Sequence, residues 1–111
     1  MKTTTKTYAK KILEVKKRCY VPDNFTGRAR WRHDNGKRRK EAAFVNGEKH
    51  GEALEWYDCG ALMRRESYVH GLWRGKEITY YPNGQKAREK TYGKEKEIWW
   101  YPDGKRWYRE D

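Results

Sequence analysis

Apolar and aromatic positions alternate with other residues in short stretches of the chain. Ile78 and Tyr80 lie two residues apart just before a turn. Successive side chains of a β-strand point to opposite faces of a sheet, so these two would share one face. The same arrangement recurs in the pairs Leu54 and Trp56, and Ile98 and Trp100. This repeated phase predicts strands that carry an aromatic ladder on one face.

Turns that end in glycine punctuate the chain at regular intervals. The turn glycines are Gly36, Gly60, Gly84 and Gly104, the first three 24 residues apart and the fourth 20 residues further on. A fixed period of this length is typical of stacked supersecondary units. The sequence therefore predicts an all-β fold, an elongated and twisted meander of antiparallel β-hairpins built from repeats of about 24 residues.

The turn residues also predict the turn type. Pro82 and Pro102 suit the first central position of a type I turn. The glycine that follows suits the left-handed position of a three-residue loop, whereas a two-residue loop would force Cys59 into that conformation. We therefore expect type I turns with a glycine bulge at all four places. Linkers between the hairpins are expected at residues 46–51, 69–75 and 93–96, the last one shortened in keeping with the 20-residue final period.

Residues 1–24 are predicted to form a basic capping segment on a repeat sheet of residues 25–111, with the whole chain as a single domain. Apolar residues of this segment fall at helical spacing, at Tyr8, Ile12, Val15 and Cys19. The run from Ile12 to Val15 suits a strand equally well. Because residues 21–25 resemble the later turns, we favour a strand that enters a hairpin over a short helix.

Composition alone leans towards disorder. Hydrophobic residues make up 35% and charged residues 39% of the chain, and the mean hydropathy is −1.39. Six Trp, nine Tyr and two Phe residues oppose this trend, because each buried aromatic ring removes a large apolar area from water. We therefore expect a folded chain that is held together mainly by aromatic side chains.

No targeting or membrane-spanning segment is evident. Residues 1–6 lack the apolar run of a signal peptide, and no stretch reaches the length of a transmembrane helix. Two cysteines, Cys19 and Cys59, are too few for a disulfide scaffold, and no Cys or His spacing matches a zinc motif. We expect a cytoplasmic protein with no metal and no cofactor.

The formal net charge of +11 is concentrated at one end of the chain. Residues 1–40 hold 14 Lys or Arg against three acidic residues, whereas residues 41–111 hold 13 of each sign. A basic end on a neutral body attracts acidic partners over several ångströms of solvent. The sequence therefore favours a partner with a negatively charged surface.

One stretch of the repeat resembles a known family. Residues 75–84 read Gly-Lys-Glu-Ile-Thr-Tyr-Tyr-Pro-Asn-Gly, and Tyr92 follows eight residues later. This pattern resembles the degenerate bacterial class of MORN repeats, most of all the antitoxin group labelled YwqK and short MORN-like phage proteins. The resemblance covers roughly residues 25–111. The chain departs from the family pattern in its first repeat, where Arg30 and Arg32 occupy the ladder positions, and in its shortened third linker.

The resemblance implies a sheet of antiparallel hairpins that binds other proteins in the cytoplasm of a bacterial or phage-infected cell. The motif residues of the family are structural, so no catalytic residue is implied. The residues agree: near His50 and His70, no Ser, Cys or paired carboxylate has the spacing of a nucleophile and its base. We therefore expect a protein that is not an enzyme.

The first functional hypothesis is a stoichiometric protein-binding inhibitor, either an antitoxin or a phage-encoded blocker of a host defence factor. Exposed Trp, Tyr and Arg are typical of binding hot spots. The tryptophans would lie opposite the aromatic ladder or in linkers, unless they pack as a second cluster against the N-terminal segment. The candidate partner-binding residues are Arg28, Arg30, Trp31, Arg32, Lys37, Arg38, Arg39, Lys40, Trp73, Trp99 and Trp107.

Nucleic-acid binding through residues 28–40 is the alternative hypothesis. Arg28, Arg30 and Arg32 would project from one strand face, and four further cations follow the turn at residues 37–40. Cations along a phosphate backbone, with rings for stacking, suit single-stranded nucleic acid. A third interpretation is an ordinary solvated face. In each case, charge reversal at the three arginines is expected to leave folding nearly intact. Membrane binding is not expected, and self-association of the sheet ends stays open.

Overall fold

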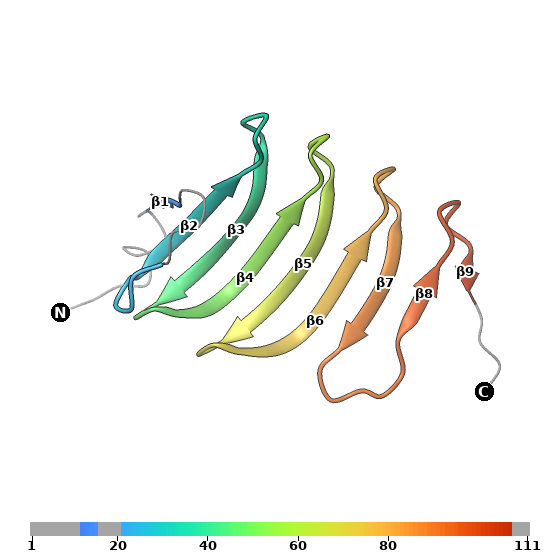
Figure 1. The fold of residues 1–111 in the computed structure, drawn as a ribbon. Coiled ribbons are helices and arrows are strands. Elements are labelled where there is room, and N and C mark those ends of the chain that lie inside the picture. Colours follow the sequence, from blue (N-terminus) through green and yellow to red (C-terminus); the bar gives the residue numbers. More distant parts are fainter. Residues whose placement is uncertain (1–11, 16–20, 108–111) are drawn as a thin grey trace.

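The computed structural model describes residues 12–15 and 21–107, which form one open β-sheet (Figure 1). Its strands lie in chain order across the sheet. They are β1 (Ile12–Glu14), β2 (Gly27–Arg32), β3 (Arg38–Val45), β4 (Glu48–Trp56), β5 (Leu62–Val69), β6 (Leu72–Tyr80), β7 (Lys86–Thr91), β8 (Ile98–Trp100) and β9 (Arg106–Trp107). From β2 to β9 every neighbouring pair is antiparallel. The predicted all-β meander is therefore confirmed.

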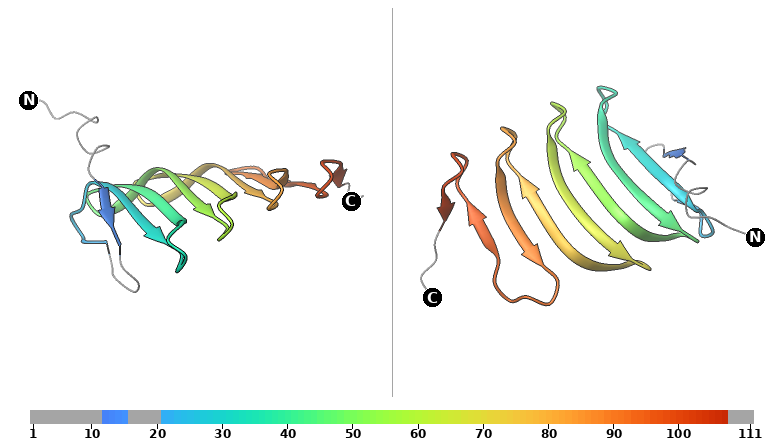
Figure 2. Two further views of the ribbon diagram at one scale, coloured as in Figure 1. Left: turned by 90° about the horizontal axis from the view of Figure 1, so that it is seen from above. Right: turned by 180° about the vertical axis from the view of Figure 1, so that it is seen from behind.

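The sheet is elongated and twisted, with one hairpin following the next along its length (Figure 2). β1 lies at one end and β9 at the other. Among the described residues the sheet is a single layer, because no helix and no second sheet packs on it. Wide parts of both faces therefore stay accessible.

The four glycine turns have the predicted geometry. In the first, the Gly36 N–H donates to the His33 carbonyl at 2.9 Å, and the His33 N–H donates to the Lys37 carbonyl at 2.8 Å. Two equivalent bonds close each of the other turns, and the turn glycines have φ between 87° and 101°, at Gly36, Gly60, Gly84 and Gly104. These are type I turns with a glycine bulge, as expected.

The first two predicted linkers are instead tight hairpin turns flanked by strands, so that prediction is wrong. Asn46 (φ 51°) and Gly47 (φ 83°) join β3 to β4, and His70 (φ 48°) and Gly71 (φ 82°) join β5 to β6. Two successive residues with positive φ form a type I′ turn, whose twist matches that of the flanking strands. Asn-Gly is itself a strong hairpin signal.

A β-bulge follows each of the first three glycine turns. The pairing moves from Trp31–Lys40 to Arg32–Arg38, so Arg39 is the extra residue. Met63 and Ala87 are the extra residues in the next two hairpins. Because the bulge recurs at the same place, equivalent residues of successive repeats stay in line across the sheet.

The aromatic ladder is confirmed by the register. Leu54, Ile78 and Ile98 lie in one row across the sheet, connected through residues of β5 and β7. Trp56, Tyr80 and Trp100 lie two residues further along the same three strands. In the first repeat Arg30 and Arg32 occupy the corresponding positions, as predicted.

The main hydrophobic core lies at the β1 end, on one face of the sheet. Its buried members are Val15, Phe25, Ala29, Ala42, Phe44 and Ala53, with Leu13, Val21, Trp31 and Tyr68 packed against them. The core therefore joins the N-terminal segment to the first two hairpins.

The N-terminal prediction needs one correction. β1 pairs with β2 in parallel, through Ile12–Arg28, Leu13–Ala29 and Glu14–Arg30, so it does not enter a hairpin with β2. The preferred strand is present, and the Val15 N–H extends the pairing with a 2.7 Å bond to the Arg30 carbonyl. The proposed helix over residues 8–19 falls largely outside the described residues, but Ile12–Glu14 is a strand.

The third connection also differs from the predicted shortened linker, because it is longer than the other two: six residues separate β7 from β8, whereas two-residue turns join β3 to β4 and β5 to β6. β7 and β8 pair only through Arg88–Trp99 and Glu89–Ile98. Residues 92–97 form the wide loop between these strands in Figure 1. The last hairpin is therefore joined to the sheet by a short seam.

Candidate functional site

The pairing register divides the side chains between two faces, which we name after Trp31 and Trp56. The Trp31 face carries two rows of side chains. The first row is Ala29, Ala42, Ala53, Glu66, Glu77 and Lys90. The second row is Trp31, Lys40, Glu55, Arg64, Thr79, Arg88, Trp99 and Trp107. The Trp56 face carries the two alternate rows. One is Arg30, Glu41, Leu54, Arg65, Ile78, Glu89 and Ile98. The other is Arg32, Arg38, Trp56, Leu62, Tyr80, Lys86, Trp100 and Arg106.

The predicted partner-binding residues are split between these faces. Five of them belong to the Trp31 face: Trp31, Lys40, Trp73, Trp99 and Trp107. Trp73 is assigned to this face because it pairs with Tyr68, which lies two residues from Glu66 on β5. Arg28, Arg30, Arg32 and Arg38 belong to the Trp56 face. A flat partner surface cannot contact both groups at once, so the two hypotheses use different sides of the sheet.

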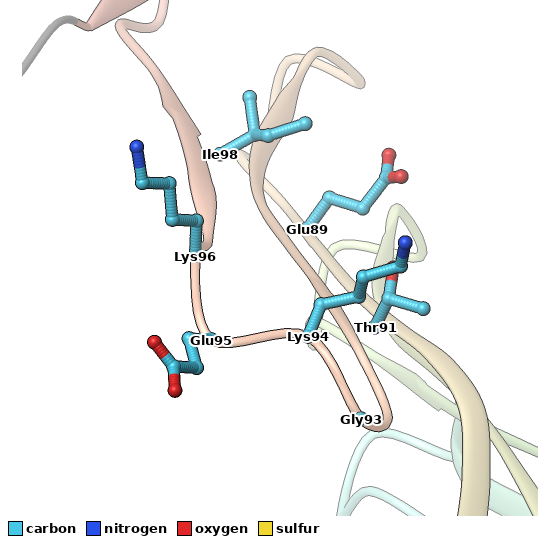
Figure 3. A pocket seen from close by; sticks show the side chains of 7 residues that line it. All are labelled: Glu89, Thr91, Gly93, Lys94, Glu95, Lys96 and Ile98. Atoms are coloured by element: carbon cyan, nitrogen blue, oxygen red, sulfur yellow. The ribbon is translucent and has the colours of Figure 1, made fainter.

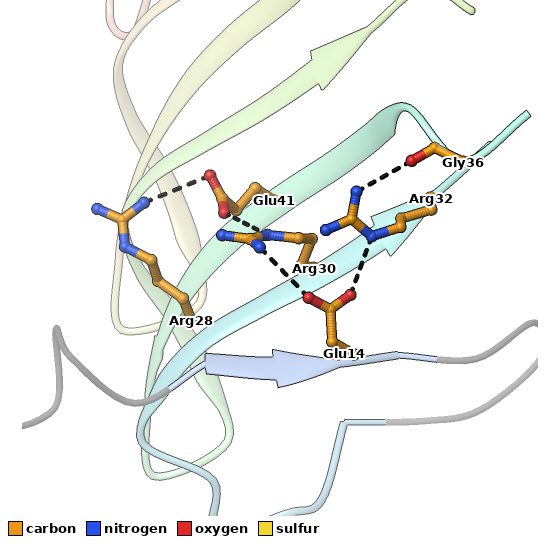
Figure 4. A network of polar contacts seen from close by, with 6 residues as sticks. All are labelled: Glu14, Arg28, Arg30, Arg32, Gly36 and Glu41. Atoms are coloured by element: carbon orange, nitrogen blue, oxygen red, sulfur yellow. Dashed lines mark hydrogen bonds and ion pairs between the residues drawn. The ribbon is translucent and has the colours of Figure 1, made fainter.

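The three arginines of β2 are occupied by carboxylates of the protein itself (Figure 4). Arg30 Nε lies 3.0 Å from Glu41 Oε2, and Arg30 also pairs with Glu14 at 3.3 Å. Arg32 Nε lies 3.3 Å from Glu14 Oε1, and Arg28 lies 3.5 Å from Glu41. Glu41 is buried, with 6% of its surface exposed. The arginines therefore hold β1 and β3 to β2.

These ion pairs change the expectation for charge reversal. Three acidic side chains in place of Arg28, Arg30 and Arg32 would surround the buried carboxylate of Glu41 with like charge. An uncompensated buried charge costs several kcal/mol. We now expect the triple reversal to prevent folding, so it cannot serve as a test of binding.

The cations after the first turn have different surroundings. The Arg38 guanidinium lies over the Trp56 ring at 4.4 Å, and Lys40 Nζ lies 5.3 Å from the Trp31 ring centre. Lys37 and Arg39 are exposed, and the ion pairs of the described residues include neither. Lys37 and Arg39 are therefore the cations of this segment that are directly available to a partner.

The four candidate tryptophans have unequal exposure. Trp31 packs against the hydrophobic core, which includes Val15 of the N-terminal segment. Trp73 meets Tyr92 edge to face, with ring centres 5.7 Å apart. Trp99 and Trp107 pack together at 6.1 Å, and each is 36% exposed. The alternative of a cluster near the N-terminal segment thus describes Trp31, while the other three lie further along the sheet.

A chain of ion pairs runs along the Trp31 face. Arg64 Nε lies 3.0 Å from Glu55, and its Nη1 lies 3.6 Å from both Glu66 and Glu77. Arg88 continues the chain with Glu77 at 3.2 Å. Charges of both signs are thus held in fixed positions between the core and the C-terminal tryptophans.

A polar pocket of about 310 Å³ opens on the same face. It is lined by Lys40, Lys49, Ala53, Leu54, Glu55, Arg64, Glu66 and Tyr68. Burial lowers the pKa of Lys49, and the positive charge of Lys40 lowers it further. Burial and the neighbouring Glu66 raise the pKa of Tyr68 to about 12. Lys49 and Tyr68 are in contact, with Nζ 4.7 Å from the ring centre.

A second pocket, of about 610 Å³, lies beside the loop between β7 and β8 (Figure 3). Glu89, Lys94, Glu95 and Lys96 supply its charged groups. Hydrogen bonds from Lys76, and then from Lys86, hold the pKa of Glu89 below its usual range. Its carboxylate is therefore already engaged.

A third pocket of about 320 Å³ lies at the far end of the sheet and is mostly apolar. It is lined by Tyr81, Trp99, Trp100, Tyr101 and Trp107. Large aromatic side chains with a polar atom at one end are common contact residues in protein interfaces. This pocket extends the aromatic surface that begins with Trp99 and Trp107.

The described residues offer little for catalysis or metal binding. No group of three or more His, Cys, Asp or Glu among residues 12–15 and 21–107 is arranged to hold a metal ion. The His70 N–H donates to His50 Nδ1 at 3.2 Å, but neither ring has a serine or cysteine within the contacts described. Cys59 is a free, exposed thiol in a turn. The part of the chain that the structure describes contains no helix that could span a membrane.

Sequence analysis did not identify Lys49, Arg64 and Arg88 as members of this surface. Arg64 and Arg88 lie 24 and 48 residues after Lys40, so the period of the glycine turns also places them in one row. Aligning the repeats in the sequence would have placed Lys40, Arg64 and Arg88 at one equivalent position. Lys49 would have appeared in the same comparison, because it is aligned with Phe25 and Trp73.

Comparison with known protein families identifies one stretch of the chain. Residues 73–94 match the family described as MORN repeat variant. They span most of β6, the glycine turn at Gly84 and β7. No curated protein and no solved structure matches the chain.

Proposed function

We propose that this MORN-like repeat protein is a non-catalytic, stoichiometric inhibitor that binds an acidic protein surface through its Trp31 face. An antitoxin and a phage-encoded blocker of a host defence factor are the two forms of inhibitor that fit this proposal. Either would act in the cytoplasm of a bacterial or phage-infected cell. MORN repeats often bind partners and are generally non-catalytic, which supports a binding role.

The placement of Trp73, Trp99 and Trp107 on one accessible face is the main support. Cations accompany the rings, since Arg88 lies 5.5 Å over Trp99 and Lys90 lies 5.8 Å over Trp73. Trp, Tyr and Arg dominate the binding energy of protein interfaces. A face that combines exposed rings with fixed cations suits a partner with apolar pockets and acidic side chains.

Nucleic-acid binding is the second candidate, and its support is narrower. Lys37 and Arg39 are exposed beside the first glycine turn. The arginines of β2 already pair with Glu14 and Glu41. Two available cations neutralise few phosphates, and affinity for nucleic acid grows with the number neutralised.

The proposal is tested by capturing partners from the native host with the wild-type chain and two variants. Trp99→Ala with Trp107→Ala removes the exposed rings, and Arg39→Gln removes an exposed cation from the other candidate surface. We expect a complex of fixed stoichiometry, measured by native mass spectrometry, with the wild type and with Arg39→Gln. The double tryptophan variant should lose it.

Two results would count against the proposal. One is a complex that survives loss of both tryptophans and disappears with Arg39→Gln. The other is retention of single-stranded DNA or RNA at roughly 50 mM salt, where phosphate contacts are strong, with no protein bound.

A further inference from the structure

Three pairs of side chains occupy the same place in successive repeats. They are Phe25 against Phe44 with ring centres at 6.3 Å, Lys49 against Tyr68 at 4.7 Å, and Trp73 against Tyr92 at 5.7 Å. The backbone relationship is also repeated, because the Gly47 N–H donates to the Phe25 carbonyl and the Gly71 N–H donates to the Lys49 carbonyl, both at 2.8 Å. Lys49 thus takes a position that the repeats before and after it fill with an aromatic ring.

A lysine is an unfavourable choice at this position. Its ammonium group is partly desolvated beside the ring of Tyr68, and Lys40 adds like charge. The ion pairs of the described residues include neither lysine. The carboxylates of Glu66 and Glu55 and the ring of Tyr68 offset only part of this cost. A residue that breaks the local pattern at a net cost to the fold is a candidate for function.

The neighbouring repeat indicates what is missing. Glu77 lies between Arg64 and Arg88, with its Oε2 at 3.6 Å and 3.2 Å from their guanidinium groups. One repeat earlier, the residues equivalent to Arg64 and Glu77 are Lys40 and Ala53. The methyl group of Ala53 lacks this carboxylate. The polar pocket of about 310 Å³ is lined by Ala53, by the cations Lys40, Lys49 and Arg64, and by Glu55 and Glu66, whose carboxylates both pair with Arg64.

We infer that this pocket binds a carboxylate of an acidic side chain from a protein partner, in the place that the Glu77 carboxylate takes one repeat later. Lys40 and Lys49 donate to it as charge-assisted donors. Arg64 contributes positive charge while it stays paired with Glu55. The inference rests on the proposed function, because it specifies the chemistry by which the Trp31 face recognises its partner.

Two variants separate this inference from a purely structural role of the lysine. Lys49→Phe restores the aromatic pair of the other repeats and removes the cation. Ala53→Glu places a carboxylate of the protein itself in the pocket. Lys94→Phe makes the same chemical change at an exposed position of the β7–β8 loop and is the matched control.

The probe is a six-residue glutamate peptide, with a six-residue glutamine peptide and inorganic phosphate as reference ligands. We expect Lys49→Phe to weaken binding of the glutamate peptide about tenfold, which corresponds to the loss of one charge-assisted contact. Lys94→Phe should change the affinity for this peptide less than about twofold. Ala53→Glu should abolish binding of the peptide; because Ala53 is buried in the core, this result counts only if urea unfolding shows that the variant is folded. Urea unfolding should show Lys49→Phe to be at least as stable as the wild type.

The side-chain NMR signal of Lys49 supplies a second readout. Bound carboxylate should raise the pKa of Lys49 towards its ordinary value, because its negative charge stabilises the ammonium group that burial and Lys40 disfavour. A larger increase with phosphate than with the glutamate peptide would overturn the assignment to a carboxylate. Equal peptide affinity for the wild type, Lys49→Phe and Lys94→Phe would overturn the site itself.

The outcome for the site is separable from that for the proposed function. If the double tryptophan variant loses the captured partner while Lys49→Phe leaves the affinity for the glutamate peptide unchanged, the inhibitor proposal stands and the carboxylate site fails. If the peptide requires Lys49 but no protein depends on the Trp31 face, the site stands and the inhibitor proposal fails.

Discussion

The Tyr57 hydroxyl donates a 2.6 Å hydrogen bond to the Tyr80 carbonyl and thereby ties one hairpin to the next. Tyr81 makes the equivalent bond to the Trp100 carbonyl at 2.7 Å. His33 takes the same place in the first repeat, with Nε2 2.9 Å from the Trp56 carbonyl. A carbonyl only accepts, so this contact requires the proton on Nε2. The first residue of each of the first three glycine turns thus fastens that turn to the first strand of the next hairpin.

Tyr57→Phe should lower the free energy of unfolding by about 0.5–1.5 kcal/mol, the usual worth of one hydrogen bond within a protein. Tyr81→Phe should cost a similar amount. Tyr101 occupies the equivalent place in the last turn, where it is 48% exposed and no hairpin follows among the described residues. Tyr101→Phe is therefore the control, and urea unfolding that shows equal losses for all three variants would refute the role of the hydroxyl as a tie.

A second hydrogen bond joins the first and third glycine turns to the next hairpin but is missing from the second turn. The Asn35 amide donates to the Asp58 carbonyl at 2.8 Å, and the Asn83 amide donates to the Pro102 carbonyl at 2.9 Å. Each Asn also accepts from a backbone N–H two residues later, at 2.9 Å. Cys59 occupies this position in the second turn and its thiol reproduces neither bond in the contacts described.

Cys59→Asn should therefore stabilise the protein by about 0.5–1.5 kcal/mol. The reverse change, Asn83→Cys, should destabilise it by a similar amount. Thermal unfolding of the two variants under reducing conditions measures both effects. A midpoint that falls with Cys59→Asn would show that the second turn differs from its neighbours in more than this side chain.

Gly47 and Gly84 have similar φ values, +83° and +91°, but different surroundings. A Cβ at Gly84 would meet no atom within 4 Å, so Gly84→Ala should cost only the conformational penalty of about 1–2 kcal/mol. Gly84→Val should cost on the order of 1–3 kcal/mol. A Cβ at Gly47 would overlap the backbone carbonyl of Asp23.

Gly47→Ala should therefore add about 1–3 kcal/mol of steric strain to the same conformational penalty. Chemical unfolding of the two alanine variants isolates this difference, because their φ values are alike. Equal losses would mean that the segment around Asp23 moves away at little cost.

Glu41 is a buried charge that both Arg28 and Arg30 contact. Arg30→Met leaves its carboxylate with the longer contact to Arg28, and should cost on the order of 3 kcal/mol. The Arg28 side chain is 45% exposed, so Arg28→Met should cost less than about 1 kcal/mol. The free energies from urea unfolding should therefore differ clearly, and equal values would contradict the assignment of Arg30 as the main partner.

The phenol of Tyr68 makes stability depend on alkaline pH. Its pKa is raised from 10.0 to about 12 in the folded protein, chiefly by burial. In the unfolded chain the proton leaves first, so the stabilisation is complete below the unfolded pKa and is lost as the pH rises towards the folded one. Tyr68→Phe lacks this loss.

The difference in unfolding free energy between the wild type and Tyr68→Phe should therefore shift in favour of the variant between pH 10 and pH 12. Tyr101→Phe makes the same chemical change at a tyrosine that is 48% exposed and serves as the comparison variant. Parallel pH profiles for the wild type and Tyr68→Phe would contradict the raised pKa.

The hairpins could be predicted because their determinants are local. The glycine of each turn adopts a conformation that other residues avoid, as at Gly84, and the two-residue period of Ile78 and Tyr80 identifies one face of a strand. Both signals lie within a few residues of the structure that they specify. The type I′ turn at Asn46 and Gly47 has an equally local signal.

The partners of the β2 arginines could not be predicted in the same way. Glu14 reaches Arg30 because β1 lies parallel to β2, and no turn sequence specifies a parallel pairing. Glu41 reaches Arg30 through the register of β2 with β3, which the bulge at Arg39 shifts by one residue. Contacts between distant strands depend on such offsets, so the charged segment looked available in the sequence and is largely occupied in the structure.

The short seam between β7 and β8 has a consequence for the dynamics of the sheet. In a linear array each hairpin is stabilised mainly by its neighbours, so the last one, held by the pairs Arg88–Trp99 and Glu89–Ile98, opens at the lowest free energy. Backbone amides of β8 should exchange with solvent deuterium faster than those of β6. Trp99 and Trp107 are carried by this hairpin, so a partner that binds them also pays the entropy of holding it closed.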